Sequence, residues 1–292
     1  MSAGALLVTG ATGMLGRDLM RVARRVGMDA TGLARAELDV TDTAAIEATL
    51  ARLRPRVVVN CAAWTDVDGA EDHAQQARAV NADGAANLAR AASAAGAPLV
   101  HISTDYVFDG NAPRDEAGAR RPYLESDPTS PRSVYGQTKL AGEQAVLAAS
   151  PRHTVVRSSW LFGTGGANFA DTMIRLAGER EAVQVVTDQV GCPTWTGHLA
   201  PALLGLLERE ATGLVHLAGS GHVSWHDFAV EIFRQAELDC RVEPASSAQL
   251  ARRAPRPAWS ALASERDDVL AMPDWRDGLA GYLAARAGIM RA

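Results

Sequence analysis

The sequence predicts an α/β fold in which a doubly wound parallel sheet is followed by a smaller α+β part. Up to about residue 160, short apolar runs alternate with longer helical patterns. The apolar runs are continuous, as in strands of a parallel sheet that is covered on both faces. Beyond that point the alternation becomes irregular. We therefore divide the chain into an α/β domain at 1–160 and a mainly α+β part at 161–292 that is interleaved with it.

Each element has its own signal. The apolar runs predict strands at 5–9, 30–33, 57–60, 99–102 and 154–157. The segments between them predict helices at 17–26, 43–53, 75–95 and 135–149. After residue 160 we expect helices at 168–180, 200–209 and 225–235, and strands at 183–186 and 214–217. The stretch 109–133 is rich in proline, glycine and charge, which is typical of a binding loop but equally of a surface excursion.

The composition excludes several classes of protein. A chain of 292 residues with 47% hydrophobic and 22% charged residues can bury a sizeable core. A net charge of −5 predicts no nucleic-acid partner and no anionic membrane surface. Cys61, Cys192 and Cys240 are too dispersed to form a disulfide framework or a zinc site. We expect a cytoplasmic enzyme.

A glycine-rich turn follows the first strand directly. Its spacing, G-x-x-G-x-x-G, allows a tight turn and a close approach of the backbone, and the following helix offers free N–H groups to a pyrophosphate. The alternative is a strand-to-helix turn that binds nothing. We expect it to bind a dinucleotide through Gly10, Thr12, Gly13, Met14, Leu15 and Gly16. This motif makes the predicted sheet Rossmann-like.

The end of the second strand indicates which dinucleotide is bound. An acidic residue there would hold the ribose 2′-hydroxyl of NAD, but the chain has Arg35, whose guanidinium suits a 2′-phosphate. We therefore expect NADPH, with NADH left open, and Asp39 and Val40 beside the adenine. Ala62 and Ala63 close the third strand and leave room for the nicotinamide ribose.

Tyr135 and Lys139 are one helical turn apart and lie on one face of a predicted helix. A nearby ammonium favours the phenolate, so we expect the pair to have a lowered tyrosine pKa and to act as a proton donor. Alone, this spacing also fits an exposed tyrosine beside a solvated lysine. Ser103, Thr104 and Asp105 end the fourth strand, where hydroxyls can stabilise a reacting oxygen.

These motifs together resemble the dTDP-4-dehydrorhamnose reductase family of extended short-chain dehydrogenases/reductases. The resemblance rests on Gly10–Gly16, Asn60–Ala63, Ser103–Gly110, Tyr135–Glu143, Ser158–Trp160, Asn168–Phe169, Asp188–Thr194 and Arg256–Leu262. It implies that 1–160 is an NAD(P)-binding Rossmann domain and that 161–292 is mainly a substrate-binding part. It also implies catalysis by Thr104, Tyr135 and Lys139, with Tyr135 and Lys139 contacting the cofactor as well.

The resemblance also implies the substrate contacts. Thr104, Asp105 and Trp160 match positions that hold the deoxyhexose, and the resemblance makes Asn168 a further substrate residue. The diphosphate region is matched by Gln189, Thr194, Arg256 and Ser260. Some members are magnesium-linked dimers that use acidic residues near the first helix. Here Arg17 and Asp18 stand there, so we expect no metal and leave a homodimer open.

The implied activity is NADPH-dependent reduction of the 4-keto group of a nucleotide-linked 6-deoxyhexose, such as dTDP-4-dehydrorhamnose to dTDP-L-rhamnose or a related dTDP-deoxysugar. A sugar-nucleotide dehydratase or epimerase is one alternative, although Tyr106 follows Asp105 where dehydratases carry a second carboxylate. A non-catalytic dinucleotide-binding regulatory subunit, related to the beta subunit of methionine adenosyltransferase, is another. The configuration at C4 and the nucleotide base stay open.

Overall fold

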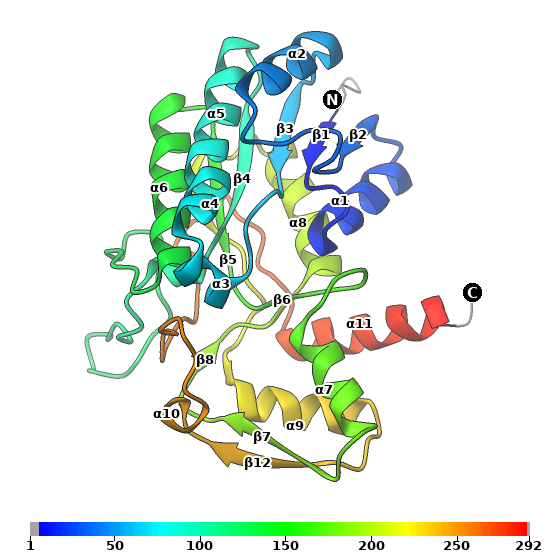
Figure 1. Cartoon of the computed structure of the whole chain (residues 1–292), viewed down its shortest axis with the longest axis vertical. Coiled ribbons are helices and arrows are strands. Elements are labelled where there is room, and N and C mark those ends of the chain that lie inside the picture. The colour runs from blue at the N-terminus through cyan, green and yellow to red at the C-terminus, as the bar shows by residue number, and fades with distance from the viewer. Residues whose placement is uncertain (1–5, 291–292) are drawn as a thin grey trace.

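The computed structural model describes residues 6–290 and contains a central sheet of six parallel strands (Figure 1). In spatial order the strands are β2 (Ala30–Leu33), β1 (Leu6–Thr9), β3 (Val57–Asn60), β4 (Leu99–Thr104), β5 (Thr154–Ser158) and β10 (Gly213–His216). The chain passes from β1 to β2 on one side and to β3 on the other. The crevice of this doubly wound sheet therefore lies at the carboxyl ends of β1 and β3.

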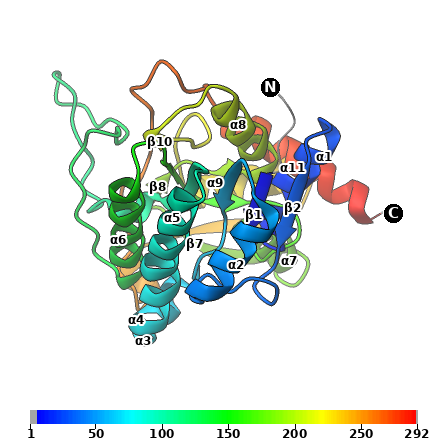
Figure 2. The same cartoon turned by 90° about the horizontal axis from the view of Figure 1, so that it is seen from above.

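Helices cover both faces of the sheet (Figure 2). One face carries α1 (Met14–Arg25) and α8 (Thr196–Glu208), and the other carries α2 (Thr43–Leu53), α5 (Ala85–Ala94) and α6 (Val134–Ala149). Leu6 and Val8 of β1 pack toward the first face, whereas Leu7 packs toward the second. This alternation explains why the strand is apolar throughout, because each face buries every second side chain.

The predicted helix at 75–95 is interrupted. It consists of α4 (Ala74–Arg78), a π-helical turn η1 (Ala79–Gly84) and α5. Within that turn, Asn81 accepts a hydrogen bond from the backbone N–H of Trp64 at 2.9 Å and donates one to Thr138 at 3.2 Å. The π-helical turn thus ties the loop after β3 to α6, as such turns often do near functional sites.

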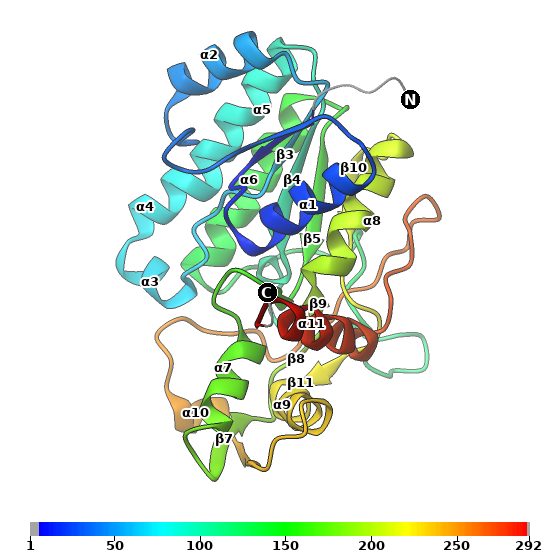
Figure 3. The same cartoon turned by 90° about the vertical axis from the view of Figure 1, so that its right-hand side faces the viewer.

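The smaller part lies below the sheet in Figures 1 and 3 and has its own aromatic core. Its core is formed by α7 (Phe169–Ala177), α9 (Trp225–Gln235) and α11 (Trp275–Met290) against the parallel pair of β7 (Ala182–Val186) and β12 (Arg241–Ala245). Short strand pairs and turns complete it: β6 (Leu161–Phe162) with β9 (Thr194–Trp195), β8 (Val190–Gly191) with β11 (Val223–Ser224), and α10 (Ser247–Leu250).

Several predicted boundaries were wrong. The first helix begins at Met14, directly after Gly13, instead of at Arg17, and α8 begins at Thr196 instead of Ala200. The helices α3 (Val67–Asp72) and α11 were not predicted. Both α8 and β10 come from the second half of the chain yet complete the sheet domain. No helix among residues 6–290 is long and apolar enough to span a bilayer.

Candidate active site

A cavity of about 510 Å³ opens at the carboxyl ends of β1 to β4. Its lining comes from the glycine turn, the loops after β2 and β3, and the start of α6. The lining includes every residue predicted to bind the cofactor: Gly10, Thr12, Gly13, Met14, Leu15, Gly16, Arg35, Asp39, Val40, Ala62, Ala63, Tyr135 and Lys139. The structure therefore brings these residues, from four separate segments, around one space.

The glycine turn has the geometry that the sequence predicts. Gly10 has φ +65°, and a Cβ added there would lie 2.7 Å from the backbone nitrogen of Ala62, so only glycine fits. The helix α1 begins four residues later at Met14, and the first residues of this helix, whose N–H groups have no partner within the helix, line the cavity. A backbone cradle at a helix N-terminus fits the pyrophosphate of a dinucleotide.

Arg35 lies at the mouth of this cavity. Its side chain is 80% exposed and forms a long ion pair, with Nε 3.6 Å from Oδ2 of Asp39. Asp39 accepts hydrogen bonds from the backbone N–H and the hydroxyl of Thr41, which lower the pKa of its carboxyl. The arrangement keeps the guanidinium accessible to an anionic group, such as a 2′-phosphate, at this end of the cavity.

Tyr135 stands at the start of α6, which Ser133 caps by accepting the N–H of Gly136 at 3.1 Å. Burial raises the pKa of Tyr135 to about 12, and hydrogen bonding with Thr104 only partly opposes it. The expected lowering of this pKa by Lys139 was therefore wrong, because burial dominates. A phenol with this pKa is protonated at neutral pH and can act as a proton donor.

Lys139 lies one turn further along α6 and is 2% exposed. Its Nζ donates to the carbonyl oxygen of Ile102 at 2.6 Å and lies 3.4 Å from Nε2 of His101. Burial lowers the pKa of Lys139 to about 8. The side chain is thus held beneath the cavity against β4, where it is a cation that can lose its charge near the working pH.

A buried ion pair between β5 and α6 supports the end of β4. Arg157 on β5 makes a two-pronged contact with Glu143 on α6, with Nε–Oε1 at 2.9 Å and Nη2–Oε2 at 2.7 Å. Ser103 donates to the same carboxylate at 2.5 Å. Since Ser103 directly precedes Thr104, this network fixes the strand end that presents the Thr104 hydroxyl.

Thr104 and Asp105 lie together beside Tyr135. The Thr104 hydroxyl donates to Oδ1 of Asp105 at 3.1 Å. Burial raises the pKa of Asp105 to about 7, against hydrogen bonds from Ser260 and Thr104. Tyr106 follows and packs edge-on against Tyr135, with ring centroids 5.5 Å apart. Four predicted site residues, including Ser260 from the far end of the chain, therefore meet at one place.

Trp160 has a strained backbone, with φ +48°. Its indole stacks on Trp225, with ring centroids 3.5 Å apart. This conformation turns the chain from β5 into the smaller part. We call the stacked indole pair of Trp160 and Trp225 the Trp160 wall. Gln189, another predicted substrate residue, donates a hydrogen bond from Nε2 to the hydroxyl of Ser247 at 2.7 Å.

Two predicted substrate residues serve the fold in this structure. Thr194 is 0% exposed, donates to the Cys192 carbonyl at 3.1 Å and accepts from the Gly219 N–H at 2.9 Å. Asn168 caps α7 by accepting the N–H of Asp171 and donates to the carbonyl of Gly163. Each side chain shapes a backbone turn, a role that sequence similarity does not distinguish from ligand binding.

Arg256 is engaged by a residue that the sequence did not single out. Its guanidinium binds Asp68 of α3 through both nitrogens, at 2.6 and 2.9 Å, and hydrogen bonding with Arg256 lowers the pKa of Asp68 to about 2. Arg253 pairs with Asp72 on the same helix. The loop before Pro257 is thereby tied to the sheet domain, and Arg256 lies beside Tyr106.

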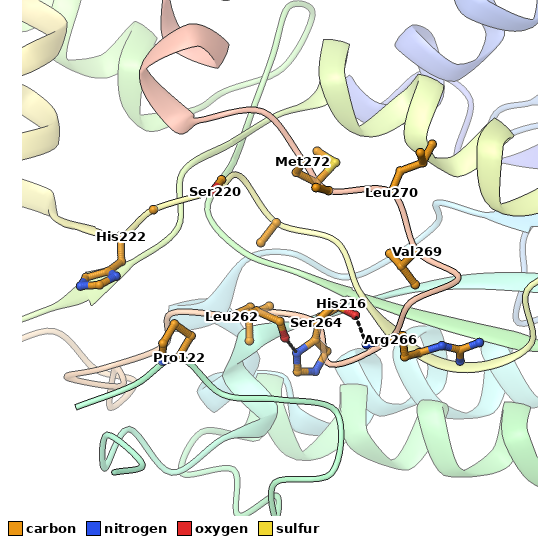
Figure 4. A pocket seen from close by; sticks show the side chains of 14 residues that line it. Pro122, His216, Ser220, His222, Leu262, Ser264, Arg266, Val269, Leu270 and Met272 are labelled. Atoms are coloured by element: carbon orange, nitrogen blue, oxygen red, sulfur yellow. Dashed lines mark hydrogen bonds between the residues drawn. The ribbon is translucent and has the colours of Figure 1, made fainter. Parts of the chain in front are cut away.

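Another cavity, of about 390 Å³, lies between the segments 216–222 and 262–272 (Figure 4). His216 bonds there to the Ala263 carbonyl at 2.9 Å, and Arg266 is paired with Asp268 at 2.5 Å. These groups already have partners, and none of the predicted site residues lines this space. Within residues 6–290, no three His, Cys, Asp or Glu side chains converge as metal ligands.

Comparisons with known proteins agree with this geometry. The family model described as "RmlD substrate binding domain" matches residues 4–287. A dTDP-4-dehydrorhamnose reductase of Streptomyces griseus is 46% identical over 97% of this chain and 94% of that protein. A probable dTDP-4,6-dihydroxy-2-methyloxan-3-one 4-ketoreductase of Streptomyces antibioticus is 44% identical over 94% of this chain and 92% of that protein.

A solved structure is similar over nearly the whole chain. The dTDP-4-dehydrorhamnose reductase of Bacillus anthracis, crystallised in complex with NADP, superposes with a TM-score of 0.92 and 36% identity over 97% of this chain and 99% of that chain. The likeness extends over both the sheet domain and the smaller part. The chain therefore belongs to the dTDP-4-dehydrorhamnose reductase family.

Proposed function

We propose that this protein reduces the 4-keto group of a dTDP-linked 6-deoxyhexose with NADPH. One observation carries the proposal. Tyr135 and Lys139 line the same cavity as the glycine turn, and Thr104 lies beside Tyr135. A proton donor is thus placed where a bound dinucleotide would present its reactive end. The names of the relatives supply the substrate class.

The residues that line the cavity fit a dinucleotide that carries a 2′-phosphate. Gly10 and the N-terminus of α1 suit the pyrophosphate, and Arg35 suits a 2′-phosphate, which favours NADPH over NADH. When bound, the cofactor supplies the hydride that reduces the carbonyl carbon. The protein supplies position and electrostatics.

Tyr135 then gives its proton to the oxygen at C4. Its raised pKa keeps the phenol protonated until charge develops on that oxygen. The Thr104 hydroxyl hydrogen-bonds the same oxygen and thereby restricts the orientation in which the substrate carbonyl can bind. Lys139 lines the same cavity as Tyr135, and its positive charge favours the phenolate that forms.

The substrate side is assigned more coarsely. Asp105 and Ser260 lie beside the catalytic pair, and the Trp160 wall offers an apolar face to a sugar ring. Arg256 lies near Tyr106, and its guanidinium suits a diphosphate. Whether the product is dTDP-L-rhamnose or another dTDP-deoxysugar depends on how these groups orient the hexose. Cytoplasmic location and a homodimer stay predictions.

The test is consumption of NADPH when dTDP-4-dehydrorhamnose is added to the purified protein, followed by NMR analysis of the product. We expect oxidation of NADPH with formation of a C4 hydroxyl, and markedly slower oxidation of NADH. Loss of water from the sugar without use of NADPH would instead favour the dehydratase alternative. Binding of NADPH without turnover of any keto-sugar nucleotide would favour the regulatory subunit.

A further inference from the structure

Lys139 is the only lysine of the chain. The other 28 of its 29 basic residues are arginines. A guanidinium stays charged at any working pH, whereas a lysine amine can lose its proton when it is buried. Position 139 therefore carries the one strongly basic side chain whose charge can change. The groups that face Nζ of Lys139 determine the pH at which this amine loses its charge.

A chain of buried hydrogen bonds leads to this amine from β1. The hydroxyl of Thr9 donates to Oδ1 of Asn60 at 2.7 Å, and the backbone N–H of Ala62 donates to the same oxygen at 3.0 Å. A backbone N–H can only donate, so the accepting atom must be the amide oxygen. The amide NH₂ of Asn60 therefore faces the other way, toward His101.

This orientation fixes the tautomer of His101. Nδ2 of Asn60 lies 3.0 Å from Nδ1 of His101, and since Nδ2 carries only hydrogens, Nδ1 must be the acceptor. Burial holds the pKa of this imidazole, 1% exposed, well below its ordinary value, so the ring is neutral. Its proton is then on Nε2, which points at Nζ of Lys139 from 3.4 Å.

An N–H directed at an amine favours the uncharged amine, because only that form has a lone pair to accept it. Other groups act in the opposite direction. The Ile102 carbonyl accepts from Nζ, and Glu143 favours the ammonium, although Arg157 balances its charge. Burial raises the pKa of the Cys61 thiol to about 12, so it stays neutral.

We propose that His101, locked by Asn60 with its proton on Nε2, is a positioning residue that sets the pH at which Lys139 loses its charge. Its consequence for catalysis rests on the proposed function. The charge of Lys139 stabilises the phenolate of Tyr135, so its loss limits reduction at alkaline pH. His101 therefore determines where the alkaline limb of the pH–rate profile lies.

The single lysine makes a direct test possible. In protein labelled with ¹³Cε-lysine, one resonance reports the titration of Lys139. His101→Phe removes the N–H, and we expect the pKa of Lys139 to rise by about half a unit or more. Asn60→Asp keeps an oxygen for Thr9 and Ala62 but requires Nδ1 to carry the proton. Nε2 then becomes an acceptor, and we expect a rise of more than about one unit.

A double variant separates the tautomer from the added carboxylate charge. If the tautomer matters, Asn60→Asp raises the pKa of Lys139 much less in the His101→Phe background. Equal rises in both backgrounds, or unchanged titration in both single variants, would overturn the inference. The alkaline limb of kcat against pH should move with the NMR titration. An NMR shift without turnover of any keto-sugar nucleotide would leave the inference standing and contradict the proposed function.

Discussion

The cofactor half and the substrate half of the site are built differently. The cofactor cavity is assembled from short motifs at strand ends, each of which places its residues through local backbone geometry. The substrate half joins residues from distant loops, and ion pairs such as Arg256 with Asp68 hold it together. Strand ends of a parallel sheet meet by topology, whereas the loops of the smaller part meet only through tertiary contacts. The first half is therefore predictable from local sequence and the second is not.

Tyr135 joins the cofactor half of the site to the substrate half, so its removal should have the largest effect on activity. Tyr135→Phe removes the proton donor but keeps the ring that packs on Tyr106, so kcat should fall by about 10³-fold. Steady-state kinetics with dTDP-4-dehydrorhamnose measures this, and NADPH affinity from fluorescence titration should stay unchanged. Retention of most of the turnover would mean that another group protonates the sugar.

The rigidity of the cofactor half depends on the buried pair behind β4. Arg157→Met leaves the Glu143 carboxylate buried without its cation, which should lower the free energy of unfolding by about 3–5 kcal/mol. Urea denaturation of the folded protein measures the change. Glu143→Gln with Arg157→Met is the matched control and should recover part of the loss. A change below about 1 kcal/mol in the single variant would show that the pair is not part of the scaffold.

Asp105 lies where the two halves of the site meet. Its ionisation changes the free energy of unfolding with pH and can therefore be measured. Its folded pKa of about 7 is above the ordinary value, so its contribution to stability is full below about pH 4 and is lost as the pH rises through 7. Asp105→Asn cannot ionise. Relative to the native chain it should therefore gain about 4 kcal/mol in free energy of unfolding between pH 4 and pH 8, since the shift is about three pKa units. A difference that is constant over this range would mean that Asp105 is already ionised at low pH.

The substrate half can be perturbed alone through Arg256. Arg256→Met should raise the KM for the sugar nucleotide by about tenfold, because a charge-assisted contact to a diphosphate is lost, while NADPH affinity stays the same. Arg253→Met on the same loop is the control and should change neither, since its side chain is 65% exposed and pairs with Asp72. Equal effects of the two variants would assign Arg256 to loop docking instead.

The smallest expected effect concerns the rim of the cofactor half. Arg35→Ala should reduce the preference for NADPH over NADH by about five- to tenfold, since one exposed guanidinium is removed from the 2′-phosphate. The ratio of kcat/KM values for the two cofactors measures it. An unchanged ratio would move the source of cofactor preference to another residue.

The sequence predicted the sheet, and the residues it singled out for the cofactor line one cavity, because continuous apolar strands and a glycine turn are local signals. It missed the π-helical turn at 79–84, whose residues are ordinary helix formers, and α3, which is too short to show a period. Similarity assigned Thr194 and Asn168 to the substrate; in the structure their side chains stabilise turns, and their substrate role stays a prediction. The partnership of Arg256 with Asp68 spans 188 residues, and no local pattern records it.

The central claim is that the dinucleotide cavity and Tyr135 act on one carbonyl. The most direct measurement uses NADPH that carries deuterium at the transferable position, with dTDP-4-dehydrorhamnose as the acceptor and NMR of the isolated product. The account predicts deuterium at C4 of the sugar, at a rate that falls about 10³-fold in Tyr135→Phe. Deuterium at another carbon, or none in the sugar while NADPH is consumed, would contradict it.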